Sequence, residues 1–166
     1  MAVYAAVGRN VLTPVKYIKF MTLVSCLCLM SAVSTAQSTQ RSLLLVSGSN
    51  SQLDALAHAE VRKVFLGVPV TTGQVRLRPL LNLADPRATS VFLQQVIFMS
   101  ERKYKRQLLS RVFRLGDQRP REYDDIELLV EDLRNTPGAL TYMWSDQFEN
   151  YTGLKSLGAL WTSSSI

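Results

Sequence analysis

The sequence predicts an α/β fold with a small mixed sheet flanked by helices, and three observations support this prediction. Short apolar runs bounded by turn residues, such as Leu43–Val46, are typical of buried strands. Apolar residues spaced by three and four positions predict helices between these runs. The chain has 166 residues, of which 47% are hydrophobic, and this is enough for one domain with an ordinary core.

The first 36 residues have the features of a secretory signal peptide. Basic residues precede an apolar run over Phe20–Met30, and Ser34-Thr35-Ala36 fits the small-x-small rule for cleavage. We therefore expect cleavage after Ala36, a periplasmic or secreted location, and a single domain over residues 37–166.

Three alternatives to a cleaved leader that starts at Met1 are less favoured. The apolar run is shorter than the roughly 20 residues of a spanning helix, so membrane attachment is expected only if the leader remains uncleaved. Cys26 follows Leu23-Val24-Ser25, which resembles a lipoprotein cleavage box, but its apolar stretch is short. Translation from Met21 instead of Met1 would remove the basic residues of the leader.

Charge and cysteine content exclude several classes of function. From Gln37 onward, sixteen Lys and Arg stand against thirteen Asp and Glu, a net charge of +3 that requires no nucleic-acid partner. Both cysteines, Cys26 and Cys28, lie in the leader, and His58 is the single histidine. We therefore expect no disulfide, no thiolate nucleophile, no metal site and no cofactor in the mature domain.

The first strand is followed by a helix and a second strand. Apolar residues over Leu53–Phe65 recur with helical spacing, and Gly67 is a typical helix stop. Pro69–Gly73 is predicted to be a loop. Val75–Leu83 is predicted to be a strand, because arginines alternate with apolar residues at its start.

The segment Asn82–Phe92 joins that strand to a helix predicted over about Ala88–Met99, and it contains the candidate site. Pro86 suits a loop or a first helical turn, and the hydroxyl residues after it are typical helix caps. A helix start offers backbone N–H groups to an anion. The candidate oxyanion-binding residues are Arg87, Ala88, Thr89 and Ser90. The alternative is that these residues only cap a helix.

A basic helix is predicted after Ser100, followed by a turn-rich connection over Leu115–Arg121. Its predicted apolar stripe, with the neighbours of that stripe, comprises Tyr104, Leu108, Leu109, Val112 and Phe113. Its basic residues could bind phosphate or a lipid surface, but the aromatic residues that nucleic-acid binding requires are not interleaved with them. We therefore expect a solvated face here and no nucleic-acid partner.

The next helix is capped by Asp124 or Asp125 and ends at Asn135, before Pro137-Gly138. Carboxylates gather around it, and helical spacing predicts that they face solvent rather than form a catalytic pair. They are Glu122, Asp124, Asp125, Glu127, Glu131 and Asp132.

Two further strands are predicted, over Ala139–Trp144 and Lys155–Trp161, with a frayed end over residues 162–166. No Gly-rich phosphate loop and no GxSxG motif occurs in the chain. Ser49 and His58 could join an aspartate in a hydrolase triad, but their spacing does not support one. We expect that the protein is not an enzyme.

Four motifs occur in the order typical of one protein family: Glu60–Gly67, Asp85–Phe92, Phe113–Gly116 and Asn135–Tyr142. Over about Leu43–Trp144 the chain thereby resembles the phosphate-binding branch of the periplasmic substrate-binding proteins. The resemblance implies a type 2 periplasmic-binding fold. The resemblance implies only the second lobe of this fold, as in the short members of the family, and the chain length agrees with a single lobe.

The resemblance also implies a function. In this family an anion is held by hydroxyls and N–H groups at a helix start with a DGSGT-like motif, and Asp85–Ser90 occupies the matching place, without its glycines. The implied ligand is phosphate or a related oxyanion, in a protein related to the binding proteins of phosphate ABC transporters. The alternative is a ligand-free interaction module that binds a protein partner in the envelope.

Overall fold

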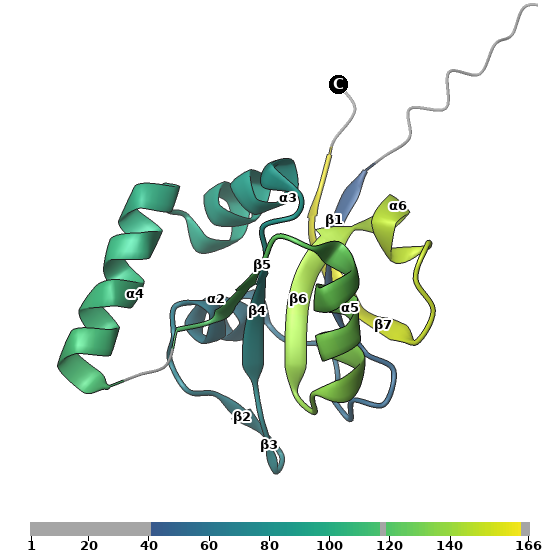
Figure 1. The fold of residues 1–166 in the computed structure, drawn as a ribbon, viewed down its shortest axis with the longest axis horizontal. Coiled ribbons are helices and arrows are strands. Elements are labelled where there is room, and N and C mark those ends of the chain that lie inside the picture. The colour runs from purple at the N-terminus through teal and green to yellow at the C-terminus, as the bar shows by residue number, and fades with distance from the viewer. Residues whose placement is uncertain (1–40, 117–118, 164–166) are drawn as a thin grey trace, which may run out of the picture. The chain divides into compact units, whose positions relative to one another are not determined.

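The computed structural model describes residues 41–116 and 119–163, and a mixed sheet of five strands lies at their centre (Figure 1). The strands are β1 (Ser42–Gly48), β4 (Arg78–Asn82), β5 (Arg121–Tyr123), β6 (Ala139–Trp144) and β7 (Leu154–Thr162). Their order in the sheet is β5-β4-β6-β1-β7. The α/β class with a small mixed sheet flanked by helices is therefore confirmed.

The sheet combines parallel and antiparallel pairs. β4 runs parallel to both β5 and β6, and β1 runs antiparallel to both β6 and β7. Hydrogen bonding continues past the β1/β7 pair, since Ser163 N donates to the backbone oxygen of Arg41 and Arg41 N donates to the Ser163 side-chain oxygen Oγ, each at 3.0 Å. The first strand of the described chain is thus paired with its last two.

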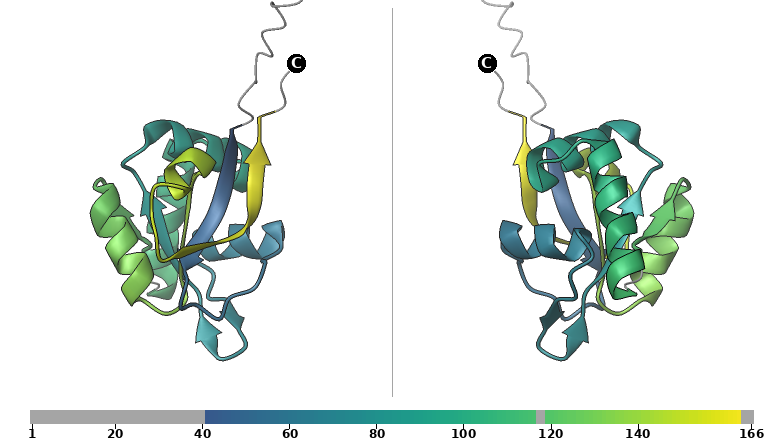
Figure 2. Two further views of the ribbon diagram at one scale, coloured as in Figure 1. Left: turned by 90° about the vertical axis from the view of Figure 1, so that its right-hand side faces the viewer. Right: turned by 90° about the vertical axis from the view of Figure 1, so that its left-hand side faces the viewer.

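Helices cover both faces of the sheet (Figure 2). One face carries α2 (His58–Phe65), α3 (Pro86–Val91), the π-helix η2 (Phe92–Ile97) and α4 (Glu101–Leu115). The other face carries α5 (Ile126–Asn135) and the short α6 (Ser145–Phe148). A separate hairpin of β2 (Thr71–Thr72) and β3 (Val75–Arg76) precedes β4.

Alternation along the strands divides the apolar residues between two cores. Leu45, Leu81 and Tyr142 belong to the core under α2 and η2, whereas Leu80 and Met143 belong to the core under α5. Successive side chains of a strand point to opposite faces, so neighbouring apolar residues serve different cores. Such runs are typical of strands buried on both sides.

Two predicted boundaries are wrong because of local geometry. The helix predicted from Leu53 begins only at His58, since residues 53–57 are irregular and the Glu60 carboxylate accepts a hydrogen bond from Ala57 N. Leu53 is nevertheless 1% exposed, so its apolar character reflects burial rather than helix. The strand predicted over Val75–Leu83 is interrupted at Leu77, where β3 ends and β4 has not begun.

Several short elements differ from the sequence prediction. The predicted loop Pro69–Gly73 contains β2, and the predicted turn Leu115–Arg121 overlaps the end of α4 and the start of β5. The last predicted strand extends to Thr162, which was assigned to a frayed end. The predicted signal peptide and residues 164–166 lie outside the described residues. Within residues 41–116 and 119–163, no helix has the length and apolar character that crossing a membrane requires.

Two predictions about helix faces also need correction. Leu109 and Phe113 of α4 are 38% and 83% exposed, so they do not lie with the buried residues Tyr104 and Leu108. The helix projects beyond the core, and its far side has no apolar partner within the described residues. Among the carboxylates near α5, Asp132 is the exception to the predicted solvent exposure, with a side chain that is only 17% exposed.

Candidate functional site

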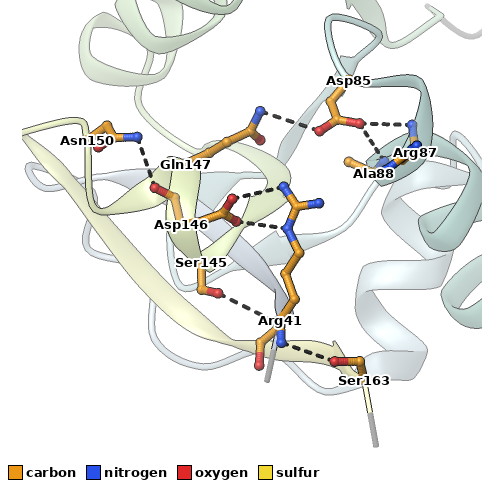
Figure 3. A network of polar contacts seen from close by, with 10 residues as sticks. Arg41, Asp85, Arg87, Ala88, Ser145, Asp146, Gln147, Asn150 and Ser163 are labelled. Atoms are coloured by element: carbon orange, nitrogen blue, oxygen red, sulfur yellow. Dashed lines mark hydrogen bonds and ion pairs between the residues drawn. The ribbon is translucent and has the colours of Figure 1, made fainter. Parts of the chain in front are cut away.

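The candidate oxyanion site lies where β4 ends and α3 begins, and Asp85 caps this helix (Figure 3). Asp85 Oδ1 accepts hydrogen bonds from Arg87 N at 2.9 Å and from Ala88 N at 3.0 Å. Asp before Pro is a typical helix start, because Pro has no N–H to satisfy. The expectation that Thr89 or Ser90 caps the helix is wrong, since both lie inside it.

The hydroxyls of the candidate site also have partners inside the protein. Thr89 Oγ1 donates to the backbone oxygens of Asn82 and Asp85, and it accepts from the Tyr142 hydroxyl at 3.3 Å. Ser90 Oγ accepts a hydrogen bond from Gln94 Nε2 at 3.2 Å. The Thr89 contacts fix the start of α3 to the core, whereas Ser90 and its partner Gln94 both lie on the exposed surface.

The four predicted residues adjoin along the chain but differ in accessibility. Ala88 is fully buried at 0% exposed, whereas Arg87 is exposed. No other described residue forms a hydrogen bond or ion pair with the Arg87 guanidinium. Since the Asp85 carboxylate already occupies the first two N–H groups of α3, a bound anion would have to displace it.

A polar network extends from Asp85 across the sheet (Figure 3). Gln147 Nε2 lies 3.5 Å from Asp85 Oδ2, and the neighbouring Asp146 accepts two hydrogen bonds from Arg41, at 3.0 and 2.9 Å. These Arg41 bonds hold the pKa of Asp146 below its usual value. The Arg41 guanidinium also lies 4.4 Å from the ring of Trp144. The network therefore ties α6 to the start of β1 and to α3.

Among the described residues, three buried polar atoms around the polar network of Asp85 lack a hydrogen-bond partner: one, Trp144 Nε1, is a donor, and the other two are acceptors. Asn82 is 0% exposed, and its Nδ2 donates to Tyr142 O at 3.2 Å, but its Oδ1 has no hydrogen-bond partner. Gln147 Oε1 is likewise unpartnered. An oxyanion needs donors, so these two atoms offer it nothing.

The described residues do not form a hydrolase triad around Ser49 and His58, nor a cluster of metal ligands. Ser49 and His58 are both exposed, and no hydrogen bond joins them in the described part of the chain. Within the same residues, no group of three or more His, Cys, Asp or Glu side chains gathers where it could hold a metal ion.

A second charged region, formed by arginines that lie far apart in the sequence, was not expected from the sequence. A hollow of about 250 Å³ lies at the opposite end of β4 from the candidate site, and four arginines line it. They are Arg76, Arg78, Arg119 and Arg121. These arginines come from two segments about 40 residues apart, and the parallel pairing of β4 with β5 brings them together. The alternating arginines of the segment Val75–Leu83 were the available signal.

Comparisons with known proteins assign no relative to this chain. No protein-family model matches it, and no curated protein matches its sequence.

Proposed function

We propose that the chain is a secreted single-lobe protein of the phosphate-binding periplasmic type, with a type 2 periplasmic-binding fold, that acts as an interaction module for an envelope protein. The order of the four family motifs supports the relationship. The mixed sheet, with α3 at the end of a parallel strand, agrees with one lobe of that fold.

The observation that carries the proposal is the outer face of α4. Leu109 and Phe113 are one helical turn apart, so they lie side by side on the exposed surface. Helical geometry also brings Arg102 and Arg106 to this side, with Lys105 at its margin. Exposed aromatic and arginine side chains are the residue types that dominate protein interfaces. A partner with an apolar pocket bordered by acidic groups would complement this face.

Phosphate binding at Arg87–Ser90 is the alternative function. It would require the Asp85 carboxylate to leave the N–H groups of Arg87 and Ala88. The interaction module requires no such rearrangement, and for this reason we favour it.

Site-specific photo-crosslinking in the native cells tests the proposal. A photoreactive residue at position 113 should give one dominant adduct, whereas the same residue at Leu128 of α5, which is 55% exposed, should not. Identical adducts from both positions, or none from position 113, would contradict the proposal. In parallel, the amide signals of Arg87 and Ala88 are followed during a phosphate titration. A saturable shift at millimolar phosphate would favour the alternative.

A further inference from the structure

We propose that the arginine-lined hollow binds a small polyoxyanion of the phosphate class. This inference is independent of the proposed function, because the hollow and the outer face of α4 share no residue. It also differs in place from the candidate site at α3, since it adjoins the amino-terminal ends of β4 and β5 rather than the carboxyl end of β4.

The charges that line the hollow are unbalanced. Asp132 is the one carboxylate among its lining residues, and Arg121 Nη1 lies 3.2 Å from Asp132 Oδ2. Asp132 also accepts hydrogen bonds from Tyr123 and Thr136. Burial alone would raise the pKa of Asp132, but these hydrogen bonds and Arg121 together lower it. The carboxylate therefore stays charged, and its oxygens are already bonded to these partners.

The other three guanidinium groups lack such a partner. Within residues 41–116 and 119–163, no carboxylate pairs with Arg76, Arg78 or Arg119. Like charges that gather around one hollow repel each other, and an anion of matching charge would relieve this repulsion. The excess of arginines therefore indicates an anionic ligand.

The strand register holds two of these arginines close together. Arg121 pairs with Leu80 in the parallel β4/β5 ladder, and Arg78 lies two residues before Leu80 on the same face of β4. This spacing separates the Cα atoms of Arg78 and Leu80 by about 7 Å along the strand. Arg121 lies opposite Leu80, about 4.8 Å away on the next strand. Long arginine side chains can span the combined separation, so both guanidiniums can contact one small ligand.

The backbone at the rim is held in place by Gly138. Arg78 N donates to Gly138 O at 2.8 Å, and a Cβ atom at position 138 would lie 2.3 Å from Arg76 O. This close approach, which only glycine allows, positions both the β3 and the β4 arginines against the turn between α5 and β6. The backbone positions of Arg76 and Arg78 beside the hollow are therefore fixed by the fold.

The lining defines the class of ligand. Guanidinium groups bind phosphate and carboxylate oxygens through paired N–H donors. The volume of about 250 Å³ suits a small molecule rather than a polymer. Arginines from both β4 and β5 favour a ligand with more than one anionic group, such as a diphosphate.

Calorimetric titration of the purified protein with inorganic pyrophosphate, in 150 mM NaCl (about physiological ionic strength), tests the proposal. We expect saturable binding that Arg78→Gln and Arg119→Gln each weaken by roughly tenfold to a hundredfold. Lys103→Gln on α4 removes the same charge from an exposed position outside the hollow, and it should leave binding unchanged. Circular dichroism and thermal melting verify that each variant is folded.

Four results would overturn the proposal, of which the last is a stronger binding of citrate. The first is the absence of a response to millimolar pyrophosphate, and the second is equal weakening by Lys103→Gln, which would indicate nonspecific attraction to a positive surface. The third is loss of binding in Arg87→Gln but not in Arg78→Gln, because this would move the anion to the start of α3. Citrate serves as a competing ligand, and stronger binding of citrate than of pyrophosphate would contradict the phosphate class.

Discussion

The ring of Phe92 stacks on the ring of Tyr142, with centroids 4.0 Å apart and an angle of 11° between the planes. Phe65 completes this cluster, 4.7 Å from Phe92 in an edge arrangement. The Tyr142 hydroxyl donates to Asn82 O at 3.2 Å, so the aromatic cluster is connected directly to the last residue of β4, just before the loop that leads to α3. Core stability and the geometry of the candidate site are therefore coupled.

Truncation of Phe92 should lower the free energy of unfolding strongly. Phe92 is 0% exposed, so Phe92→Ala leaves a cavity and should cost about 3–5 kcal/mol. Phe113→Ala provides the control, because this side chain is 83% exposed and its loss should change stability by less than about 0.5 kcal/mol. Urea denaturation of both variants measures the difference, and equal destabilisation would contradict the assigned packing.

Removal of the Asp85 carboxylate should affect stability and anion binding in opposite directions. Asp85→Ala loses the helix cap and should cost about 0.5–2 kcal/mol, whereas Asp85→Asn keeps an acceptor and should cost less. The freed N–H groups of Arg87 and Ala88 should then respond to phosphate in amide spectra of Asp85→Ala. An equal response in the unmodified protein would show that the carboxylate does not block the site.

Substitution of Gly138 should be more costly than substitution of Gly73. Both residues have a positive φ, of 78° and 61°, which costs a non-glycine residue about 1–3 kcal/mol. A Cβ at position 138 also collides with Arg76 O, whereas a Cβ at position 73 meets nothing within 4 Å. Thermal melting should therefore show a larger decrease in melting temperature for Gly138→Ala than for Gly73→Ala. The difference between the two decreases measures the cost of the collision with Arg76 O.

Acidic pH should lower the free energy of unfolding, partly through protonation of the Asp146 carboxylate. The hydrogen bonds from Arg41 lower the pKa of Asp146 in the folded state. A lowered pKa contributes stability above the unfolded-state pKa, and this contribution disappears as the pH falls through the folded-state pKa. Asp146→Asn should therefore reduce stability at pH 7 and flatten the acid limb of the stability curve.

The size of this pH effect is expected to be small, because the Asp146 side chain is 56% exposed. Asp54→Asn is the matched control, since Asp54 is exposed and no ion pair involves it within the described residues. Urea denaturation at pH 3 and pH 7 compares the two variants. An acid limb that is unchanged in Asp146→Asn would contradict the assigned contribution.

Contiguous apolar strands were the most predictable part of the fold. Leu43–Val46, Ala139–Trp144 and Lys155–Trp161 all lie within observed strands. The first two belong to central strands, which carry a continuous apolar signal that is independent of their neighbours. The polar edge strand β5 carries no such signal. Its three residues form a strand only through pairing with β4, about 40 residues earlier in the chain.

The junction between strand and helix at Asn82–Phe92 was predicted correctly, but the residue that caps its helix was not. The helix does begin at the end of β4, as the change from strand to helical spacing indicated. The pair Asp85-Pro86 is itself a typical start signal, and it should have been preferred over Thr89 and Ser90. The arginine-lined hollow could not be predicted, because strand register brings its two segments together.

The pairing of β1 has a consequence for the order of folding. β1 lies between β6 and β7, so both of its neighbours come from the last quarter of the chain. During synthesis, Leu43 and Leu45 therefore emerge long before any strand can cover them. Non-local pairing of this kind slows folding, since a long loop must close before the contacts form. The sheet can be completed only after residues 139–162 have been synthesised, so until then the apolar residues of β1 are exposed to aggregation.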